Sequence, residues 1–284
     1  MSIASKLSGR SPTLEAEILV VDGSQRETIP DRLAVEEPLE IRILTTAGER
    51  AVAVTMRTPG ADEELAAGFL YAEGVLRERG DLLGFASSPS AGTVGKIVRL
   101  RLREGMEPDL APLERHFTTT SACGLCGKAG LDALLLGREP DLPRGPSVEV
   151  ELLYELPEAL RRAQDVFAST GGLHAAALFD LDGQLVAARE DVGRHNALDK
   201  LLGWAFLEGR LPLHQGLLLL SGRSSYELVQ KTLMAEVPIL CSVSAPSSAA
   251  VAMARRYGLT LVGFLRDRRL NVYSGVERLR LSTR

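Results

Sequence analysis

Three short apolar segments in the second half of the chain most restrict its fold. They lie at 217–220, 239–243 and 259–265, and segments with helical character lie between them at 226–235 and 248–257. Strands that alternate with helices of about ten residues are typical of a largely parallel sheet covered on both faces. We therefore expect an α/β fold for this half of the chain.

The residues before these strands extend the pattern. A helix is predicted over 158–167, and another begins near Arg194. Between them, the Asp182-Gly183 pair separates the apolar runs 175–179 and 185–188, which predicts a β-hairpin.

The first half of the chain predicts a mixture of strands and one amphipathic helix. Strands are expected at 18–21, 39–44, 51–56 and 94–102. Asp62 is predicted to cap a helix whose apolar positions Leu65, Phe69, Ala72 and Leu76 recur at helical spacing. This part is therefore expected to be an α+β domain.

A linker divides the two parts. Three prolines fall within residues 138–147, a density that is typical of a connection between domains. We expect a mobile tail at 1–13, an N-terminal domain at 14–145 and a C-terminal domain at 146–284.

Small polar residues follow all three strands of the C-terminal sheet. The loops are 221–225 and 244–248, which precede helices, and the arginine-rich segment 266–269. If the strands are parallel, all three loops lie at one edge, where open α/β sheets bind nucleotides. Arg223 and the arginines of 266–269 would then neutralise phosphates, although serines before helices are often simple caps.

The start of the helix near residue 194 is a second candidate. Arg194 and Asn196 occupy its first turn and could face a ligand. Asp199 and Lys200 are expected to lie off the buried face of this helix. The alternative to a ligand site is a helix with a charged surface, in which His195 and Asp199 form an i,i+4 pair. His174 is predicted with equal weight to be structural or active.

The third candidate is the pair Cys123 and Cys126 in a C-x-x-C sequence. Glycines at 124 and 127 keep bulk away from both sulfurs, and Lys128 and the start of a predicted helix favour the reactive thiolate. Half of a zinc site, a redox dithiol, a sulfur-carrying nucleophile pair and exposed thiols without a role all remain open. A zinc site would lack ligands at tight spacing, because the other candidates are Cys241 and four scattered histidines.

Composition narrows the class of partner. A net charge of −4 and a pI near 5.7 argue against broad binding of nucleic acids or anionic membranes. An odd count of three cysteines fits a reducing cytoplasm. No apolar run approaches the roughly 18 residues of a membrane span, and no secretory signal is recognisable.

Several of these motifs together resemble one family. They are Met56-Arg-Thr-Pro-Gly60, Ser121-Ala-Cys-Gly-Leu-Cys-Gly127, Glu190-Asp-Val-Gly-Arg-His-Asn-Ala-Leu-Asp-Lys200, Ser221-Gly-Arg-Ser-Ser-Tyr-Glu227 and Leu261-Val-Gly-Phe-Leu265. Over roughly residues 17 to 280 the chain resembles the FdhD/NarQ family of formate dehydrogenase accessory proteins.

The resemblance implies a sulfurtransferase-type carrier. A cysteine desulfurase would load sulfane sulfur as a persulfide on Cys123, with Cys126 as partner or alternative acceptor. The sulfur would then pass to the molybdenum bis(molybdopterin guanine dinucleotide) cofactor before this cofactor enters formate dehydrogenase. The alternative is a zinc-binding or dithiol structural module.

The resemblance also implies a fold and a binding segment. It predicts a homodimer and a C-terminal domain with a cytidine deaminase-like three-layer αβα fold, without deaminase activity because the H-x-E and P-C-x-x-C ligands are not reproduced. GDP is the expected mimic of the cofactor, which by the resemblance would contact Phe264, Leu265, Arg266, Asp267, Arg268 and Arg269. The loop and helix candidates above add Arg223, Ser224, Arg194 and Asn196 as expected contacts.

Overall fold

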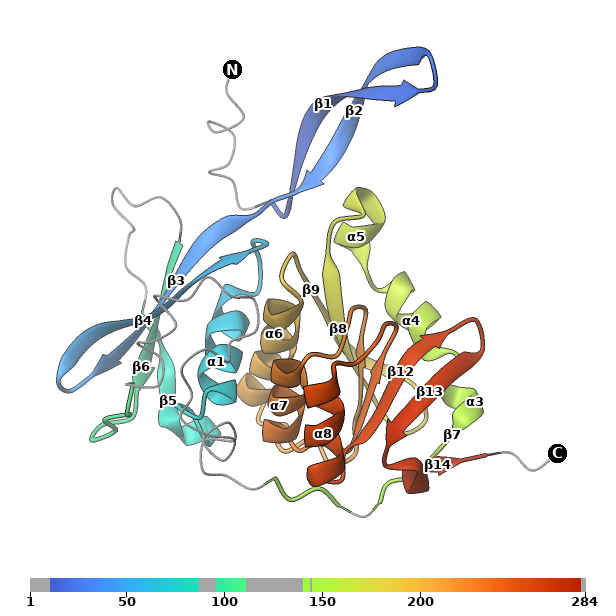
Figure 1. Cartoon of the computed structure of the whole chain (residues 1–284). Coiled ribbons are helices and arrows are strands. Elements are labelled where there is room, and N and C mark those ends of the chain that lie inside the picture. Colours follow the sequence, from blue (N-terminus) through green and yellow to red (C-terminus); the bar gives the residue numbers. More distant parts are fainter. Residues whose placement is uncertain (1–10, 87–95, 111–139, 144, 282–284) are drawn as a thin grey trace.

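A computed structural model describes residues 11–86, 96–110, 140–143 and 145–281 (Figure 1). Cys123 and Cys126 lie outside these ranges, as do residues 1–10 of the predicted tail. Among the described residues, no helix is long and apolar enough to cross a membrane.

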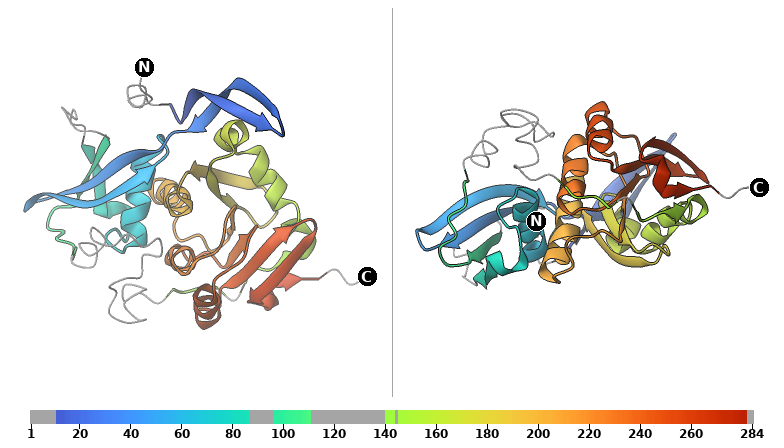
Figure 2. Two further views of the ribbon diagram at one scale, coloured as in Figure 1. Left: turned by 45° about the horizontal axis from the view of Figure 1, so that its top comes forward. Right: turned by 90° about the horizontal axis from the view of Figure 1, so that it is seen from below.

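The second half of the chain forms a mixed sheet with helices on both faces (Figures 1 and 2). In order across the sheet, the strands are β13 (Arg269–Ser274), β12 (Thr260–Arg266), β11 (Ile239–Ser242), β10 (Leu217–Leu220), β8 (His174–Phe179) and β9 (Leu185–Asp191). The helices α6 (Arg194–Leu207), α7 (Tyr226–Met234) and α8 (Ser248–Arg256) cover one face, and α3 (Val150–Leu153) and α4 (Leu156–Arg162) cover the other. This three-layer arrangement confirms the predicted α/β class.

Burial on both faces explains the four consecutive leucines of β10. Successive side chains of a strand point to opposite faces. Leu217 and Leu219 accordingly join the core beneath α3 and α4, whereas Leu218 and Leu220 join the core beneath α6 and α7. A strand buried in this way shows no alternation of apolar and polar residues.

The sheet is less parallel than predicted. Strand β11 is parallel to both β10 and β12, but the pairs β8–β9, β8–β10 and β12–β13 are antiparallel. Strand β13 was not predicted. The turn before it is made by Asp267 and Arg268, whose φ values are 52° and 54°. Glycine or asparagine normally marks a turn of this geometry, and the sequence has neither at these positions. The segment 266–269 is thus the tip of a hairpin.

The predicted helix over 158–167 is also wrong in its extent. The structure has two shorter helices, α4 and α5 (Asp165–Thr170), which are separated at residues 163–164. The carboxylate of Glu190 accepts hydrogen bonds from the backbone N–H groups of Val166 and Phe167 and so fixes the start of α5.

The first half of the chain forms a four-stranded sheet with one helix packed against it. The strand order is β4 (Gly48–Arg57), β3 (Glu37–Thr45), β6 (Lys96–Leu102) and β5 (Leu82–Ala86), and the helix is α1 (Asp62–Ala72). A short 3₁₀ turn, η2 (Arg79–Asp81), precedes β5. These elements confirm the strands predicted around residues 39–44, 51–56 and 94–102.

Asp62 does not cap α1 as predicted. It is the first residue of the helix, and the N-cap residue, Ala61, makes no capping hydrogen bond through its side chain. The Asp62 carboxylate instead pairs with the buried guanidinium of Arg57 at 2.7 Å. Although burial opposes it, the bonds to Arg57 and Lys96 lower the pKa of Asp62.

A two-stranded arm precedes this sheet. Strands β1 (Thr13–Asp22) and β2 (Gln25–Ala34) pair antiparallel around the turn Gly23-Ser24 and project beyond the rest of the fold (Figure 1). The sequence predicted only residues 18–21 as a strand. Strand β2 was missed because it lies largely exposed and carries mainly polar residues.

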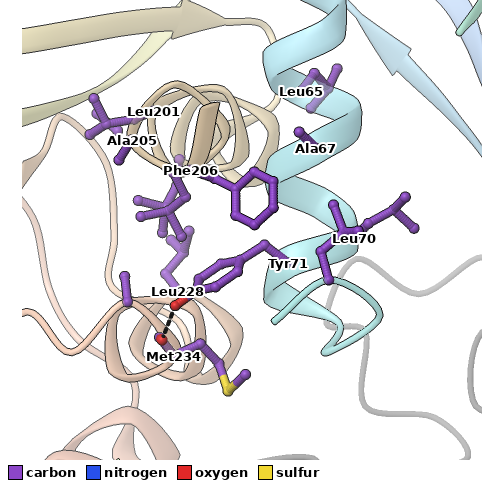
Figure 3. Close-up of a cluster of buried hydrophobic side chains, with 14 of the residues drawn as sticks. Leu65, Ala67, Leu70, Tyr71, Leu201, Ala205, Phe206, Leu228 and Met234 are labelled. Atoms are coloured by element: carbon purple, nitrogen blue, oxygen red, sulfur yellow. Dashed lines mark hydrogen bonds between the residues drawn. The ribbon is translucent and has the colours of Figure 1, made fainter. Parts of the chain in front are cut away.

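One hydrophobic core joins the two halves of the chain. Helices α1 and α6 cross so closely that a Cβ at Gly68 would collide with the carbonyl oxygen of Asp199, and one at Gly203 with that of Glu64. Beside this crossing, the Tyr71 hydroxyl donates a 2.6 Å hydrogen bond to the carbonyl of Met234 (Figure 3). The core therefore contains residues of both predicted domains, and the boundary near residue 145 stays a prediction.

The end of the chain returns to the start of the second half. After η5 (Val276–Arg278), strand β14 (Leu279–Arg280) pairs parallel with β7 (Val148–Glu149). Arg278 donates to the carbonyl of Pro143, within the proline-rich segment.

Candidate functional site

Two of the three predicted loops meet at one edge of the C-terminal sheet, and strand β12, which leads to the third, lies beside them. The loop 221–225 follows β10 and the loop 244–248 follows β11, and they are joined by a 3.0 Å hydrogen bond from Ser247 N to the carbonyl of Ser224. The carbonyl of Ser244 accepts from the backbone N–H of Phe264 in β12 at 3.1 Å. The expectation that the ends of these strands converge is confirmed.

Both serines that precede the helices at this edge are also caps. The Ser225 hydroxyl accepts from Leu228 N at the start of α7, and the Ser247 hydroxyl accepts from Ala250 N at the start of α8. Ser224 differs from them, because its fully buried hydroxyl has no partner among the described residues.

A cluster of nitrogen-bearing side chains borders the loop after β10. A Cβ at Gly222 would lie 3.3 Å from His174 Nδ1 and 4.0 Å from Arg194 Cδ, so the loop runs close to both side chains. Burial, then the charges of Arg194 and Arg223, lower the pKa of His174. His174 is therefore a neutral group near two cations at neutral pH.

Arg194 is incompletely bonded at this position. Its Nε is buried and finds no hydrogen-bond acceptor among the described residues. A buried donor or acceptor without a partner costs about 1–3 kcal/mol, and a bound anion would supply the missing partner for a guanidinium.

His195 points to α7 instead of to Asp199. Its Nε2 lies 3.2 Å from the hydroxyl of Ser225 and 3.5 Å from the carboxylate of Glu227. Burial lowers the pKa of His195 to about 4, despite the opposing charge of Glu227. The proposed i,i+4 pair with Asp199 is not formed.

Asp199 and Lys200 are both buried, contrary to the expectation that they lie off the buried face of the helix. The Asp199 carboxylate accepts two hydrogen bonds, of 2.8 and 3.0 Å, from Lys231 Nζ. Burial alone would lower the pKa of Lys231, but Asp199, Glu227 and Glu73 outweigh it and raise that pKa. The prediction failed because α1 and α7 cover the side of α6 that an isolated amphipathic helix would leave in water.

Lys200 belongs to a second buried set, which joins the halves of the chain. Its Nζ lies 2.7 Å from the carboxylate of Asp191 and donates to the carbonyl of Thr58 at 2.9 Å. Thr58 N in turn donates to Asp191, and Val192 N donates to the Thr58 hydroxyl. This buried set was not predicted from the sequence. The available signal was the presence of the charged residues Asp199 and Lys200 within the apolar pattern of a helix.

Asn196 is part of this junction and not of the loop edge. Its Nδ2 donates to the carbonyl of Met56 at 2.8 Å and to Asp191 Oδ1 at 3.0 Å, and its Oδ1 accepts from the Thr55 hydroxyl. All the hydrogen-bonding capacity of the side-chain nitrogen is therefore used within the protein.

The hairpin tip presents the remaining predicted contacts. Phe264 has a φ of 53° at an irregularity in β12, and Leu265 is fully buried in the core, which leaves only its backbone for a ligand. The residues from 266 to 269 are exposed. Arg268 lies over the ring of Tyr154, with its guanidinium 3.6 Å from Glu155.

Cys241 is the one cysteine that the described ranges contain, and it is fully buried in β11. Burial raises the pKa of its thiol to about 12. At neutral pH this cysteine is a protonated, inaccessible thiol. Within the described residues, no group of three or more His, Cys, Asp or Glu side chains could hold a metal ion.

A solved structure shows the same overall fold. A putative formate dehydrogenase accessory protein from Desulfotalea psychrophila superposes with a TM-score of 0.74 at 23% identity, and the match covers 95% of this chain and 100% of that chain. At this identity the similarity concerns the fold.

Curated relatives match at much higher identity. The sulfur carrier protein FdhD of Streptomyces coelicolor is 50% identical over 280 residues, which cover 96% of this chain and 97% of the relative. That of Mycobacterium tuberculosis is 47% identical over 275 residues, 94% of this chain and 98% of the relative. The profile of the FdhD/NarQ family matches residues 34–280. With the motifs and the fold in agreement, the chain belongs to the FdhD/NarQ family.

Proposed function

We propose that this protein is a sulfur carrier that accepts sulfane sulfur from a cysteine desulfurase and delivers it to the molybdenum bis(molybdopterin guanine dinucleotide) cofactor before the cofactor enters formate dehydrogenase. The observation that carries the proposal is near-full-length identity of about half with curated sulfur carrier proteins. The C-x-x-C sequence at Cys123 and Cys126 supports it.

In the loading step, the Cys123 thiolate attacks the terminal sulfur of the desulfurase persulfide. One S–S bond forms on Cys123 while the S–S bond of the desulfurase breaks, and the desulfurase cysteine leaves as a thiolate, so no outside oxidant or reductant is needed. Cys126 is the partner or the alternative acceptor. Because Cys241 is buried and protonated, it does not compete for the sulfur.

Mass spectrometry tests this step. After incubation with a desulfurase and cysteine, the protein should gain about 32 Da per sulfur, which reduction removes. We expect Cys123→Ala to abolish loading, and Cys241→Ala, the matched control, to retain it. Full loading of Cys123→Ala would show that the assignment to Cys123 is wrong. Stoichiometric zinc in the purified protein, with no gain in mass, would favour a metal-binding module.

We further propose that the cofactor's guanine dinucleotide arms bind at the loop edge of the C-terminal sheet. Two neighbouring cations, Arg194 and Arg223, with the neutral His174 beside them, suit a phosphate. The buried Arg194 Nε and Ser224 Oγ, which lack partners among the described residues, would gain them. The end of β12 and the hairpin tip, residues 264–269, add backbone groups and exposed arginines.

Calorimetry with GDP tests this site. A charge-assisted contact contributes roughly 1.5–3 kcal/mol, so Arg194→Ala and Arg223→Ala should each weaken GDP binding about tenfold or more. Arg210→Ala is the control, because Arg210 stacks on Trp204 after the last turns of α6. Unchanged affinity in both edge variants would exclude this edge as the nucleotide site.

The remaining proposals concern context. We infer that the protein acts in the cytoplasm as a homodimer, with a cysteine desulfurase and formate dehydrogenase as its partners. The relatives' name and the family support the association with formate dehydrogenase maturation.

A further inference from the structure

The β1–β2 arm exposes apolar side chains on a surface that nothing in the described chain covers. The register of the hairpin puts the odd-numbered residues of β1 and the even-numbered residues of β2 on one face. These residues are Glu15, Glu17, Leu19 and Val21 of β1 and Arg26, Thr28, Pro30 and Arg32 of β2. On this face Leu19 and Val21 are 60% and 59% exposed. A two-stranded hairpin is marginally stable alone, so such a surface favours a partner.

The outer edge of β1 is also available for pairing. Among the described residues, the arm forms a sheet of its own, in which neither strand pairs with a third, and β2 packs against α5. Paired residues of an antiparallel ladder alternately point their backbone groups inward and outward. Counted from the two-residue turn, residues 17, 19 and 21 of β1 and residues 26, 28 and 30 of β2 point theirs outward.

The two edges differ in what they offer. Pro30 lacks a backbone N–H, so β2 has a missing donor on its outer edge, a common protection against pairing. The outward positions of β1 carry Glu17, Leu19 and Val21, all with a backbone donor and acceptor. Strand addition is therefore expected at β1.

The charge pattern of the exposed face selects the partner and its direction. Acidic Glu17 lies toward the base of the arm, and basic Arg26 lies near the tip, opposite Val21. When a second β1 runs antiparallel with Leu19 opposite Leu19, Glu17 of each strand lies beside Val21 of the other, next to Arg26. A parallel arrangement would bring like charges together.

We propose that the arm binds the arm of a second copy of this chain, with β1 pairing antiparallel to β1 around a two-fold axis at Leu19. Such an interface is self-complementary, as a two-fold contact requires. This inference deepens the homodimer of the proposed function by naming its surface. It does not depend on sulfur chemistry, because a monomeric protein that still loads sulfur would overturn the homodimer and its surface but not the sulfur carrier.

The first test compares proline substitutions at two cross-strand partners. Leu19→Pro removes an outward N–H from β1, and Thr28→Pro removes the equivalent group from the outer edge of β2. Analytical ultracentrifugation of the full chain should find a dimer for the wild type and Thr28→Pro. For Leu19→Pro we expect a dimer dissociation constant raised at least about tenfold.

Exchange of charges gives a second test that leaves the backbone intact. Glu17→Arg and Arg26→Glu should each weaken the homodimer, because each places like charges beside one another at both ends of the interface. An equimolar mixture of the two variants should form a heterodimer, because residue 17 of each copy then has a charge opposite to that of residue 26 of the other copy. The effect should decline at high salt.

Three results would overturn the proposal. They are a monomeric wild type, an unchanged dimer constant in Leu19→Pro with native circular dichroism, and the absence of heterodimers from the charge-exchanged mixture. If Leu19→Pro fails to fold, the charge variants decide, because Glu17 and Arg26 are exposed.

Discussion

Burial separates Cys241 from the sulfur chemistry proposed for Cys123 and Cys126. The thiolate is the reactive form of cysteine, and the pKa of Cys241, raised by burial to about 12, keeps that residue protonated at neutral pH. Because Cys241 is not in contact with water, other proteins cannot reach its thiol either.

We therefore predict that iodoacetamide leaves Cys241 unmodified in the native protein and modifies it after unfolding in urea. Peptide mass spectrometry at pH 8 measures the labelling. Cys241→Ala should cost roughly 1–2 kcal/mol of stability, because it removes a buried sulfur from β11. Rapid native labelling of Cys241 would contradict its burial.

His195 should make the stability depend on pH. Its folded pKa of about 4 lies below the ordinary value of 6.5, so the unfolded chain binds the proton more tightly. Its contribution is complete above pH 6.5 and is lost as pH falls toward 4. The charged or titratable groups around it are Glu227, Lys231, Arg194 and His174.

We predict that His195→Gln reduces the loss of stability between pH 7 and pH 4.5 by on the order of 2 kcal/mol. Urea unfolding of both proteins at the two pH values measures it. An equal loss in the variant would mean that other groups carry the pH dependence.

At the scale of elements, the crossing of α1 and α6 depends on two glycines. A methyl group at Gly203 meets the carbonyl of Glu64, a backbone group that cannot move aside without displacing the helix. Gly203→Ala should therefore destabilise the protein by roughly 3 kcal/mol or more, despite the better helix propensity of alanine.

Gly80→Ala is the matched control, because a methyl group there meets only the end of the Glu78 side chain at 3.9 Å. Its effect should stay within about 0.5 kcal/mol, as for other uncrowded surface sites. Thermal unfolding of the two variants compares them, and equal melting temperatures would contradict the close crossing.

At the scale of the whole molecule, Asn196 connects the halves of the chain. Its side chain bonds to strand β4 in the first half and to Asp191 in the second. If Asn196 serves this junction, its substitution should lower stability and spare GDP binding. If it binds the cofactor, its substitution should weaken GDP binding and spare stability.

We predict that Asn196→Ala lowers the free energy of unfolding by about 1–3 kcal/mol, because it removes the hydrogen bonds to Met56 and Asp191 that join the two halves, and keeps the affinity for GDP within about twofold. Arg194→Ala should show the reverse, with weak binding and nearly normal stability. Loss of GDP binding in a stable Asn196→Ala protein would return this residue to the nucleotide site.

The local pattern of residues was enough to predict much of this architecture. Apolar runs and helical spacing predicted α1, the β8–β9 hairpin, and β10, β11 and β12 with the helices between them. The parallel order of those three strands then brought the loops 221–225 and 244–248 to one edge. These features depend on short-range periodicity, which the sequence by itself contains.

Only the tertiary structure decided which charged residues are buried and which apolar residues are not. Asp199 is buried because Lys231, on the next helix, neutralises it. Asp191 is buried because Lys200 pairs with it and Thr58 bonds to it across the junction of the halves. Leu19 has the residue type of a core position but lies 60% exposed on the arm. The physical reason is that the free energy of burying a charge depends on partners far away in the sequence, and no local pattern records where those partners will lie.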